Sequence, residues 1–314
     1  MLRVSEIGVV VPTKDRPHDL GMLLENLEGQ AVPPARVVVV DGGDEPVESL
    51  VHGRRYAFPV QYLRHRPPSA AAQRNAGIAL LKGRYRLIGL LDDDIQLAPD
   101  ALRYMAAFWE SDRGVGVAGA AFCQEGQEAL QRGGFLKRSR FSEALGLYSR
   151  QPGRVAASGW HAPVGTVTED TPVDWLQTGA AVWRSEVFDG HRFDERFHSY
   201  SYLEDLDFSY GVSRSARLVV VANARYRHFD HHSNLSGAWY RRFGEMEVRN
   251  RLYFVRKHHL SVASCYLGLG IRFFQTLGEA MLSRRRVLLS RATGNLRGFS
   301  RELGARLSGP RGGG

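Results

Sequence analysis

The chain has 314 residues, of which 43% are hydrophobic and 24% charged, the balance of an ordinary soluble globular protein. Its 42 Lys and Arg outnumber its 33 Asp and Glu, and the net charge of +9 favours anionic partners such as phosphorylated small molecules, nucleic acid or anionic lipid. No stretch approaches the ~20 apolar residues of a membrane-spanning helix, and we expect no secretory signal at the N-terminus.

The cysteine pattern indicates the cellular compartment, and the absence of nucleic-acid-binding motifs limits the expected partners. Cys123 and Cys265 form neither a metal-binding pattern nor a disulfide framework, which fits a reducing, cytoplasmic compartment. No zinc-finger spacing, RNA-recognition signature or heptad basic region accompanies the positive charge. We therefore expect no nucleic-acid partner.

The first 125 residues alternate between buried-strand and amphipathic-helix patterns. The predicted strands cover residues 7–12, 35–43, 59–65, 85–91 and 114–122, and the predicted helices 13–27, 69–83 and 99–110. Strands that alternate with helices through short loops predict βαβ units and a mostly parallel sheet. In such sheets ligands bind at the carboxyl ends of the strands.

The remaining two thirds of the chain are less regular. Residues 123–173 are rich in Gly, Ser and Arg without sustained periodicity, which indicates long loops. Residues 236–258 predict one long helix, and the tail that follows mixes helical apolar spacing with a series of arginines. This tail is compatible with an amphipathic helix on anionic lipid at the inner face of the membrane, and also with a solvated helix packed on the domain.

Three consecutive carboxylates, Asp92, Asp93 and Asp94, follow the predicted strand 85–91 directly. Because these side chains repel one another, packing alone gives no reason for the triplet. Mg²⁺ and Mn²⁺ prefer oxygen ligands, and Asp92 and Asp94 can face the same side of an extended segment. The triplet therefore fits a cation site, and by itself it also fits a solvated acidic turn.

Four segments in a fixed order carry a resemblance to a known family. They are VVVPTKDRP at the first strand end, VVVVDGGDEP at the second, AAAQRNAGI on the helix over 69–83, and LLDDDIQLAPDAL at the fourth strand. Together they resemble the family-2 glycosyltransferases, which have the GT-A nucleotide-sugar fold. Downstream, WLQTGAAVWRSEVFDGHRFDERFHSYSYLEDLDFSYGVSR and RHFDHHS are similar to the bacterial rhamnosyl- and galactofuranosyltransferase branch. The resemblance covers residues 5 to 260.

The resemblance implies a nucleotide-sugar site at the strand ends. Pro12, Thr13 and Arg16 match the first nucleotide loop, in which an arginine can meet phosphate. The residues implied to contact the base, ribose, diphosphate or sugar are Asp41, Arg74, Asp92 and Asp93. The second motif departs from the family pattern of Asp-Asp or Asp-Asn followed by Gly-Ser, because this chain has Asp41-Gly42-Gly43-Asp44. The donor is therefore open among UDP-, dTDP- and GDP-linked sugars.

The resemblance also implies a divalent cation, Mn²⁺ or Mg²⁺. Asp94 matches the last Asp of the Asp-x-Asp motif, which binds the metal. His228 lies where related enzymes place a histidine that completes the metal shell, and His231 and His232 are alternatives for this role. The cation would stabilise charge on the departing nucleoside diphosphate.

On the acceptor side, Asp205 matches the catalytic base of the family's Glu-Asp motif. An inverting transfer needs one carboxylate that takes a proton from the acceptor hydroxyl, on the face opposite the leaving group. Glu204 would then hold the acceptor, with Trp175 and Gly179 on the same side. Acidic residues in this position would also favour a helix N-terminus, which is compatible with catalysis.

The sequence thus predicts a mixed α/β GT-A fold with a helical C-terminal extension. We expect a nucleotide-sugar-binding half over 1–125, an acceptor-binding and catalytic half of the same domain over 126–235, and the extension over 236–314. The expected function is inverting, metal-dependent transfer of a sugar to an acceptor hydroxyl. The alternatives are a basic nucleic-acid-binding or scaffold protein on the same fold, and a nucleotidyltransferase that makes sugar nucleotides.

Overall fold

The structure, a computed structural model, describes residues 6–126, 139–198, 201–229, 235–283 and 285–307. The chain divides into two compact units. The first, which we call the sheet unit, comprises Met1–Gly133, Gln151–Arg154 and His161–Asp230. The second, the helical unit, comprises Gly134–Arg150, Val155–Trp160 and His231–Gly314.

The sheet unit is built on a nine-stranded mixed sheet in the described part of the chain. The strands are β1 (Ile7–Thr13), β2 (Arg36–Asp41), β3 (Val60–Arg64), β4 (Leu87–Leu91), β5 (Ile95–Leu97), β6 (Val117–Gln124), β7 (Thr171–Val173), β8 (Ala180–Arg184) and β9 (Arg217–His228). Their order is β3-β2-β1-β4-β8-β6-β9-β5, with β7 paired to β9. β1 is parallel to β2 and β4, β2 to β3, and β6 to β9, whereas β8, β5 and β7 pair antiparallel.

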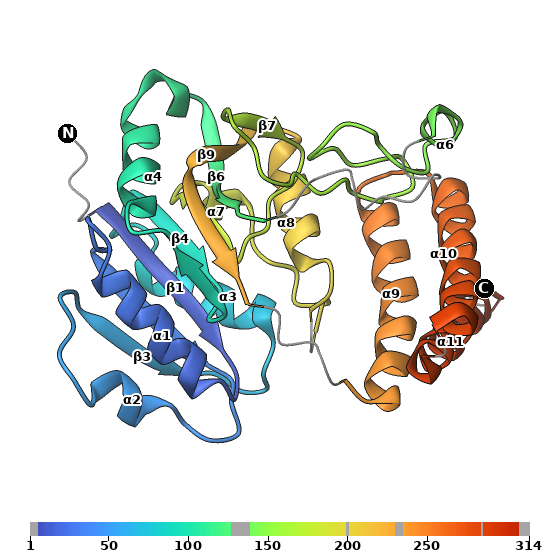
Figure 1. Cartoon of the computed structure of the whole chain (residues 1–314), viewed down its shortest axis with the longest axis horizontal. Helices are drawn as coiled ribbons and strands as arrows, with labels where there is room; N and C mark the ends of the chain where they lie inside the picture. The colour runs from blue at the N-terminus through green and yellow to red at the C-terminus, as the bar shows by residue number, and fades with distance from the viewer. Residues whose placement is uncertain (1–5, 127–138, 199–200, 230–234, 284, 308–314) are drawn as a thin grey trace, which may run out of the picture. The chain divides into compact units, whose positions relative to one another are not determined.

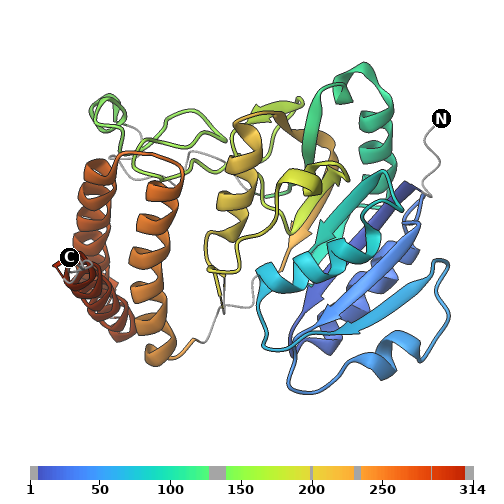
Figure 2. The ribbon, with the colours of Figure 1, turned by 180° about the vertical axis from the view of Figure 1, so that it is seen from behind.

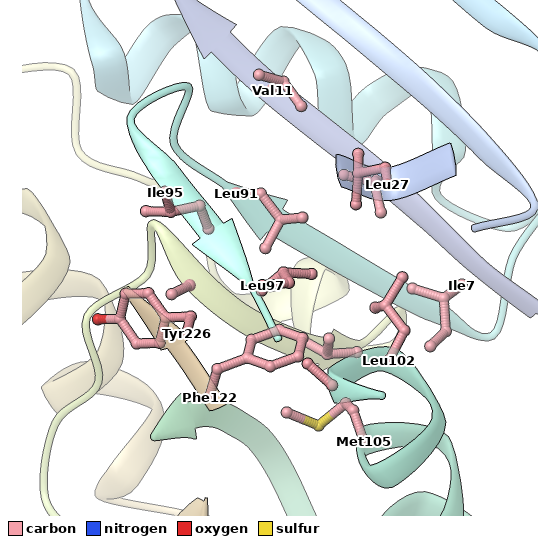
Figure 3. Packing of buried hydrophobic residues seen from close by; sticks show 14 of the residues in the cluster. Ile7, Val11, Leu27, Leu91, Ile95, Leu97, Leu102, Met105, Phe122 and Tyr226 are labelled. Atoms are coloured by element: carbon pink, nitrogen blue, oxygen red, sulfur yellow. The ribbon is translucent and has the colours of Figure 1, made fainter. Parts of the chain in front are cut away.

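Helices cover both faces of this sheet (Figures 1 and 2). They are α1 (Pro17–Glu28), α2 (Glu48–His52), α3 (Ala70–Leu81), α4 (Ala101–Glu110), α7 (Val187–Gly190) and α8 (Glu204–Ser213), with a 3₁₀ turn at Asp112–Gly114. Val9 and Val11 of β1 belong to the core under α1 and α4, whereas Val10 belongs to the opposite core under α3 and α8. This alternation explains why the strand is apolar throughout. Figure 3 shows Ile7 beside Leu102, with Leu27 and Met105 in the same first core.

The predicted fold class and the predicted elements of the first 125 residues are confirmed, with small shifts at their ends. The helix expected from residue 99 begins at Ala101, and the carbonyl of Pro99 accepts a hydrogen bond from the Ala31 amide at 3.0 Å. The strand expected from residue 114 begins at Val117, because a 3₁₀ turn and the left-handed Gly116 (φ 70°) precede it.

The helical unit consists of α6 (Arg140–Ala144), α9 (Gly237–Lys257), α10 (Val262–Ser283) and α11 (Arg286–Leu307). α9 and α11 pack most closely (Figure 1). A Cβ on Gly244 or Gly294 would overlap the main chain of the other helix. A buried Glu247 carboxylate on α9 also pairs with Arg291 of α11 at 2.7 Å. No helix in the described residues is long and apolar enough to cross a membrane.

The helical unit differs from the extension predicted over 236–314, because it also takes in two segments from the irregular region. The packing of Trp160 accounts for one of these segments, Val155–Trp160. Its ring lies under the Arg251 guanidinium of α9, 4.4 Å from the centroid, and a Cβ on Gly268 of α10 would touch it. The same arginine donates to the carbonyl of Gly159 at 2.5 Å. Trp160 is thus a packing residue in this unit.

We predict that Gly77→Ala destabilises the protein by about 1–2 kcal/mol, because α3 lies too close to the sheet for a side chain at this position. A Cβ there would overlap Val10 and lie 3.0 Å from Val40. Urea denaturation measures the change. Gly21→Ala is the matched control, since its Cβ would meet only Leu50 at 3.7 Å and should be neutral or stabilising. Equal stability of the two variants would contradict this packing.

Candidate active site

Asp41 ends β2 and organises the loop that follows it. Its carboxylate is fully buried and accepts hydrogen bonds from the amides of Gly43 (2.7 Å) and Val47 (3.1 Å). It also accepts from Tyr62 (2.8 Å) and Arg64 (2.7 Å) on β3. Burial alone would raise its pKa, but these donors outweigh that effect and hold the pKa below the usual range. Both oxygens are therefore engaged within the protein, and contact with a nucleotide would require exchanging one of these bonds.

The loop after β1 holds the acidic triplet from one side. Asp93 is buried, accepts a hydrogen bond from the Thr13 hydroxyl at 2.7 Å, and lies 3.0 Å from Arg16. Arg16 also donates to Asp94 at 2.6 Å. Burial raises the pKa of Asp93 to about 6, despite the lowering effects of Thr13 and Arg16. The parallel pairing of β1 with β4 places these strand ends together.

Asp94 and His228 meet because two strands that are distant in sequence pair. β5 runs antiparallel to β9 with Ile95 opposite His228, and the carbonyl of Asp94 accepts from the Phe229 amide at 2.9 Å. His228 Nε2 consequently lies 3.3 Å from Asp94 Oδ1. The predicted pair is thus brought together. His231 and His232, the alternatives, lie outside the described residues.

The chemistry of this pair fits a cation. Asp94 Oδ1 is buried and accepts no hydrogen bond from the described protein. Burial alone would raise the Asp94 pKa, but His228 and Arg16 lower it, so the carboxylate stays ionised. An ionised carboxylate oxygen next to an imidazole nitrogen, which binds metals in its neutral form, is a suitable pair of ligands for Mn²⁺ or Mg²⁺. Among the described residues no group of three or more His, Cys, Asp and Glu could hold a metal by itself, so other ligands would come from the substrate or water.

Arg74 of α3 forms the second centre, which we call the arginine cluster: Arg74, Asp92, Glu204 and Asp205. Its guanidinium is only 3% exposed. Arg74 pairs with Asp92 at 2.6 Å, with Glu204 in a very short contact, and with Asp205 at 3.4 Å. Arg74 thus binds three carboxylates and does not lie on a solvated face of α3.

Asp205 and Glu204 begin α8 but have different surroundings. Glu204 is buried, and burial together with the neighbouring Asp205 raises its pKa well above the usual range. The Asp205 side chain is 30% exposed, and Thr178 donates its hydroxyl to it. Burial raises the pKa of Asp205, while Arg74 and Thr178 oppose the rise. The preceding residue, Leu203, has a left-handed φ of 77°, a strained conformation for this residue type.

Gly179 and Trp175, the two other residues predicted on the acceptor side, pack and form hydrogen bonds within the protein. Gly179 accepts from the Asp92 amide at 2.8 Å, and any Cβ on it would overlap the Asp92 carboxylate. Gly179 therefore leaves the space that Asp92 occupies. Trp175 is buried, donates its Nε1–H to the carbonyl of Ala162 at 3.1 Å, and packs edge-on against His161. It lines a small cavity with Leu176 and other residues near β6.

Comparisons with known proteins agree with this architecture. Residues 8–160, just under half of the chain, match the family model described as glycosyl transferase family 2. GalNAc-T7, solved with UDP, GalNAc and Mn²⁺, is 14% identical with a TM-score of 0.58, over 80% of this chain and 47% of that chain. The mannosyltransferase PcManGT from Pyrobaculum calidifontis, solved with GDP-Man and Mn²⁺, is 14% identical with a TM-score of 0.52, over 93% and 87% of the two chains.

The chain has the GT-A glycosyltransferase fold. A Haemophilus influenzae protein described as an uncharacterized glycosyltransferase is 34% identical over 95 residues, which cover 30% of this chain and 31% of the relative. The match thus spans about a third of that curated relative. The family model and the curated relative thus show a similarity to glycosyl transferase family 2 over part of the chain, and the rhamnosyl- or galactofuranosyltransferase branch stays a prediction.

Several site residues of this GT-A chain were not predicted. Thr178 positions Asp205, and Tyr62 and Arg64 fix Asp41. Gln73 donates to the carbonyls of Thr13 (2.9 Å) and Val40 (2.8 Å), which joins the first two loops. A signal existed for Tyr62 and Arg64, because residues two apart on a strand share a face and both lie on the strand predicted over 59–65.

We predict that Arg74→Gln lowers the free energy of unfolding by about 3–5 kcal/mol, because it leaves buried carboxylates without their counter-ion. The Arg74→Gln/Glu204→Gln double variant should recover part of this loss. Stability of the single variant should rise as the pH falls, since protonation of Glu204, whose pKa is already raised, removes an uncompensated charge. Urea denaturation over a pH series measures both effects.

The matched control is Arg103→Gln, which breaks an exposed ion pair with Asp100 on α4. Exposed pairs contribute little, so the change should stay below about 1 kcal/mol. A small loss in Arg74→Gln, or no recovery in the double variant, would show that the arginine cluster is not a stabilising centre.

Proposed function

We propose that this chain is an inverting, metal-dependent glycosyltransferase that moves a sugar from a nucleoside diphosphate to an acceptor hydroxyl. The observation that carries the proposal is the presence of two distinct carboxylate centres at one end of the GT-A sheet. One combines Asp94 and His228, and the other is the arginine cluster with the exposed edge of Asp205. The Asp94–His228 centre suits a metal ion that binds the leaving group, and the arginine cluster with Asp205 suits the acceptor hydroxyl.

At the donor end, Asp94 and His228 would hold Mn²⁺ or Mg²⁺, which neutralises charge on the departing diphosphate when it is bound. Two solved proteins of the same fold were solved with both Mn²⁺ and a nucleotide or nucleotide sugar. Arg16, which touches both Asp93 and Asp94, supplies a further positive charge within reach of phosphate oxygens. Thr13 keeps Asp93 in place through its hydroxyl.

At the acceptor end, Asp205 is the proposed base. Its carboxylate is partly exposed, so an acceptor hydroxyl can reach it, while Glu204 beside it is buried. Asp205 takes the hydroxyl proton as the acceptor oxygen bonds to the anomeric carbon and the bond to the nucleoside diphosphate breaks. Burial raises the pKa of Asp205, which makes it a stronger base than an exposed Asp.

The acceptor, the sugar and the membrane contact of the whole protein are further parts of the proposal. The irregular segment over 123–173 is where acceptor recognition is expected, because long loops carry variable specificity. A glycan, a lipid-linked glycan or a small natural product would each supply a hydroxyl. The sheet unit has 23 Lys and Arg against 28 Asp and Glu, which disfavours the nucleic-acid-binding alternative for this site.

We predict that one of UDP, GDP and dTDP binds only in the presence of Mn²⁺ or Mg²⁺, and that Asp94→Asn weakens this binding at least about 100-fold. The magnitude follows because even groups that only support metal ligands cost roughly 10–100-fold when removed. Isothermal titration calorimetry with and without each cation measures it. Asp112→Asn, an exposed acid of the same sheet unit, is the control and should bind like the native protein.

Metal-independent binding, or equal binding by Asp94→Asn and Asp112→Asn, would contradict the donor site. Binding of none of the three nucleotides would remove the support for a common sugar-nucleotide donor.

We predict that Asp205→Asn lowers kcat by about 10²–10⁴-fold while metal-dependent nucleotide binding is retained. Release of the nucleoside diphosphate measures turnover, and the stereochemistry of the product measured by NMR tests inversion. Loss of nucleotide binding in this variant, or unchanged turnover, would exclude Asp205 as the base.

The pH dependence gives a separate test of Asp205. Turnover should fall as the pH drops through the raised pKa of Asp205, since the base must be ionised. Thr178→Val removes a hydrogen bond that lowers this pKa, so the acid limb of the kcat/KM profile should move up by as much as about one pH unit. Thr166→Val, an exposed threonine, is the control and should leave the limb in place. An acid limb that does not respond to Thr178→Val would assign the ionisation to another group.

A further inference from the structure

The positive charge of the chain belongs to one of its two units. The helical unit has 19 Lys and Arg against 5 Asp and Glu, whereas the sheet unit has 23 against 28. The net charge of +9 is therefore the sum of a small negative charge on the sheet unit and a large positive charge on the helical unit. A positive charge concentrated in this way favours binding of the helical unit to a polyanionic surface.

The same unit exposes an apolar stripe along α10. Leu267, Phe274 and Met281 are spaced by seven residues, and their exposed fractions are 50%, 70% and 78%. Seven residues are close to two helical turns, so the three side chains lie on one face of the helix. The only charged residues of α10 are Arg272 and Glu279, and neither falls at this spacing.

α11 repeats the pattern with Leu289, Leu296 and Leu303, which are also spaced by seven residues and about half exposed. Arginines accompany both stripes. Arg285 and Arg286 are exposed at the end of α10 and the start of α11, and Arg297 is exposed beside Leu296. Large apolar side chains exposed in an ordered series indicate a binding surface, because isolated globular domains rarely leave such patches in water.

We propose that the helical unit binds an anionic lipid bilayer through the apolar face of α10, with α11 and the arginines at its border. Apolar side chains enter the boundary between headgroups and acyl chains, while the arginines contact anionic headgroups. A second copy of this chain is a poorer occupant of the face, since two units with this excess of positive charge repel each other. The inference rests on the helical unit alone and is independent of the transferase reaction.

The experiment is flotation of the native chain with vesicles of phosphatidylcholine, alone or mixed with phosphatidylglycerol. We expect the chain to float with the anionic vesicles, to stay unbound with neutral ones, and to dissociate as the salt concentration rises. The triple variant Leu267→Gln/Phe274→Gln/Met281→Gln should bind at least about tenfold more weakly. Its side chains are exposed, so the fold is retained, and circular dichroism checks this.

The arginines are tested separately with Arg285→Gln/Arg286→Gln, which should weaken binding by roughly twentyfold, given the contribution of each basic residue near an anionic surface. The matched control is Arg55→Gln/Arg217→Gln, which removes two exposed arginines from the sheet unit. Val115→Gln, an exposed apolar residue of the sheet unit, is the control for the triple variant. Both controls should bind like the native chain.

Three outcomes would overturn the proposal. The first is equal binding to neutral and anionic vesicles, and the second is native binding by the triple variant. The third is a native dimer, seen by light scattering without vesicles, that the triple variant converts to a monomer, because the α10 face would then be a self-association surface. Nucleotide titration of the same variants should match the native chain, so a failure of the lipid proposal is separate from a failure of the proposed function.

Discussion

The buried guanidinium of Arg74 is the interaction on which the catalytic side of the sheet unit depends. It brings together three carboxylates from two separate segments: Asp92 after β4, and Glu204 and Asp205 at the start of α8. Without a cation between them these groups would repel one another, and burial would keep them protonated. The arginine therefore has two effects. It allows α3 and α8 to approach, and it keeps Asp205 ionisable while the surrounding burial raises its pKa.

Neighbouring carboxylates also repel one another on the donor side, where a different arrangement of groups relieves the repulsion. Asp94 receives Arg16 on one oxygen, and its other oxygen remains without a hydrogen bond beside His228. The pairing of β5 with β9 fixes this arrangement through the main chain, so the two groups are held without large side-chain rearrangement. One carboxylate centre is thus neutralised permanently by the protein, and the other is left with capacity for a cation. Such a difference between neighbouring carboxylates assigns them different chemical tasks.

The sequence was sufficient to predict strands β1 to β4 and β6 and helices α1, α3, α4 and α9, but not strands β5, β7, β8 and β9. Continuous β-branched runs such as 37–40 specify buried strands, and the carboxyl ends of parallel strands meet at one edge. The network inside the site was less predictable. The contact of Arg74 with Glu204 joins residues 130 positions apart, through packing of α3 and α8 that local patterns do not encode. Asp41 was expected to face a nucleotide. Its carboxylate instead points into the protein, where it pairs with Arg64, the residue opposite it in the β2–β3 register.

The net charge of +9 for the whole chain does not describe the sheet unit, which has more acidic than basic residues. In the proposed function, a nucleoside diphosphate approaching the sheet unit would meet more acidic than basic residues, so long-range attraction by the domain would not bring it to the site. Local groups must do so: Arg16 at the triplet, Arg64 and Arg66 around the β2 loop, and a cation at Asp94. The acidic triplet then has a physical reason. In the proposed function its negative charge would concentrate the cation, and the cation would reverse the sign of the potential that the diphosphate experiences.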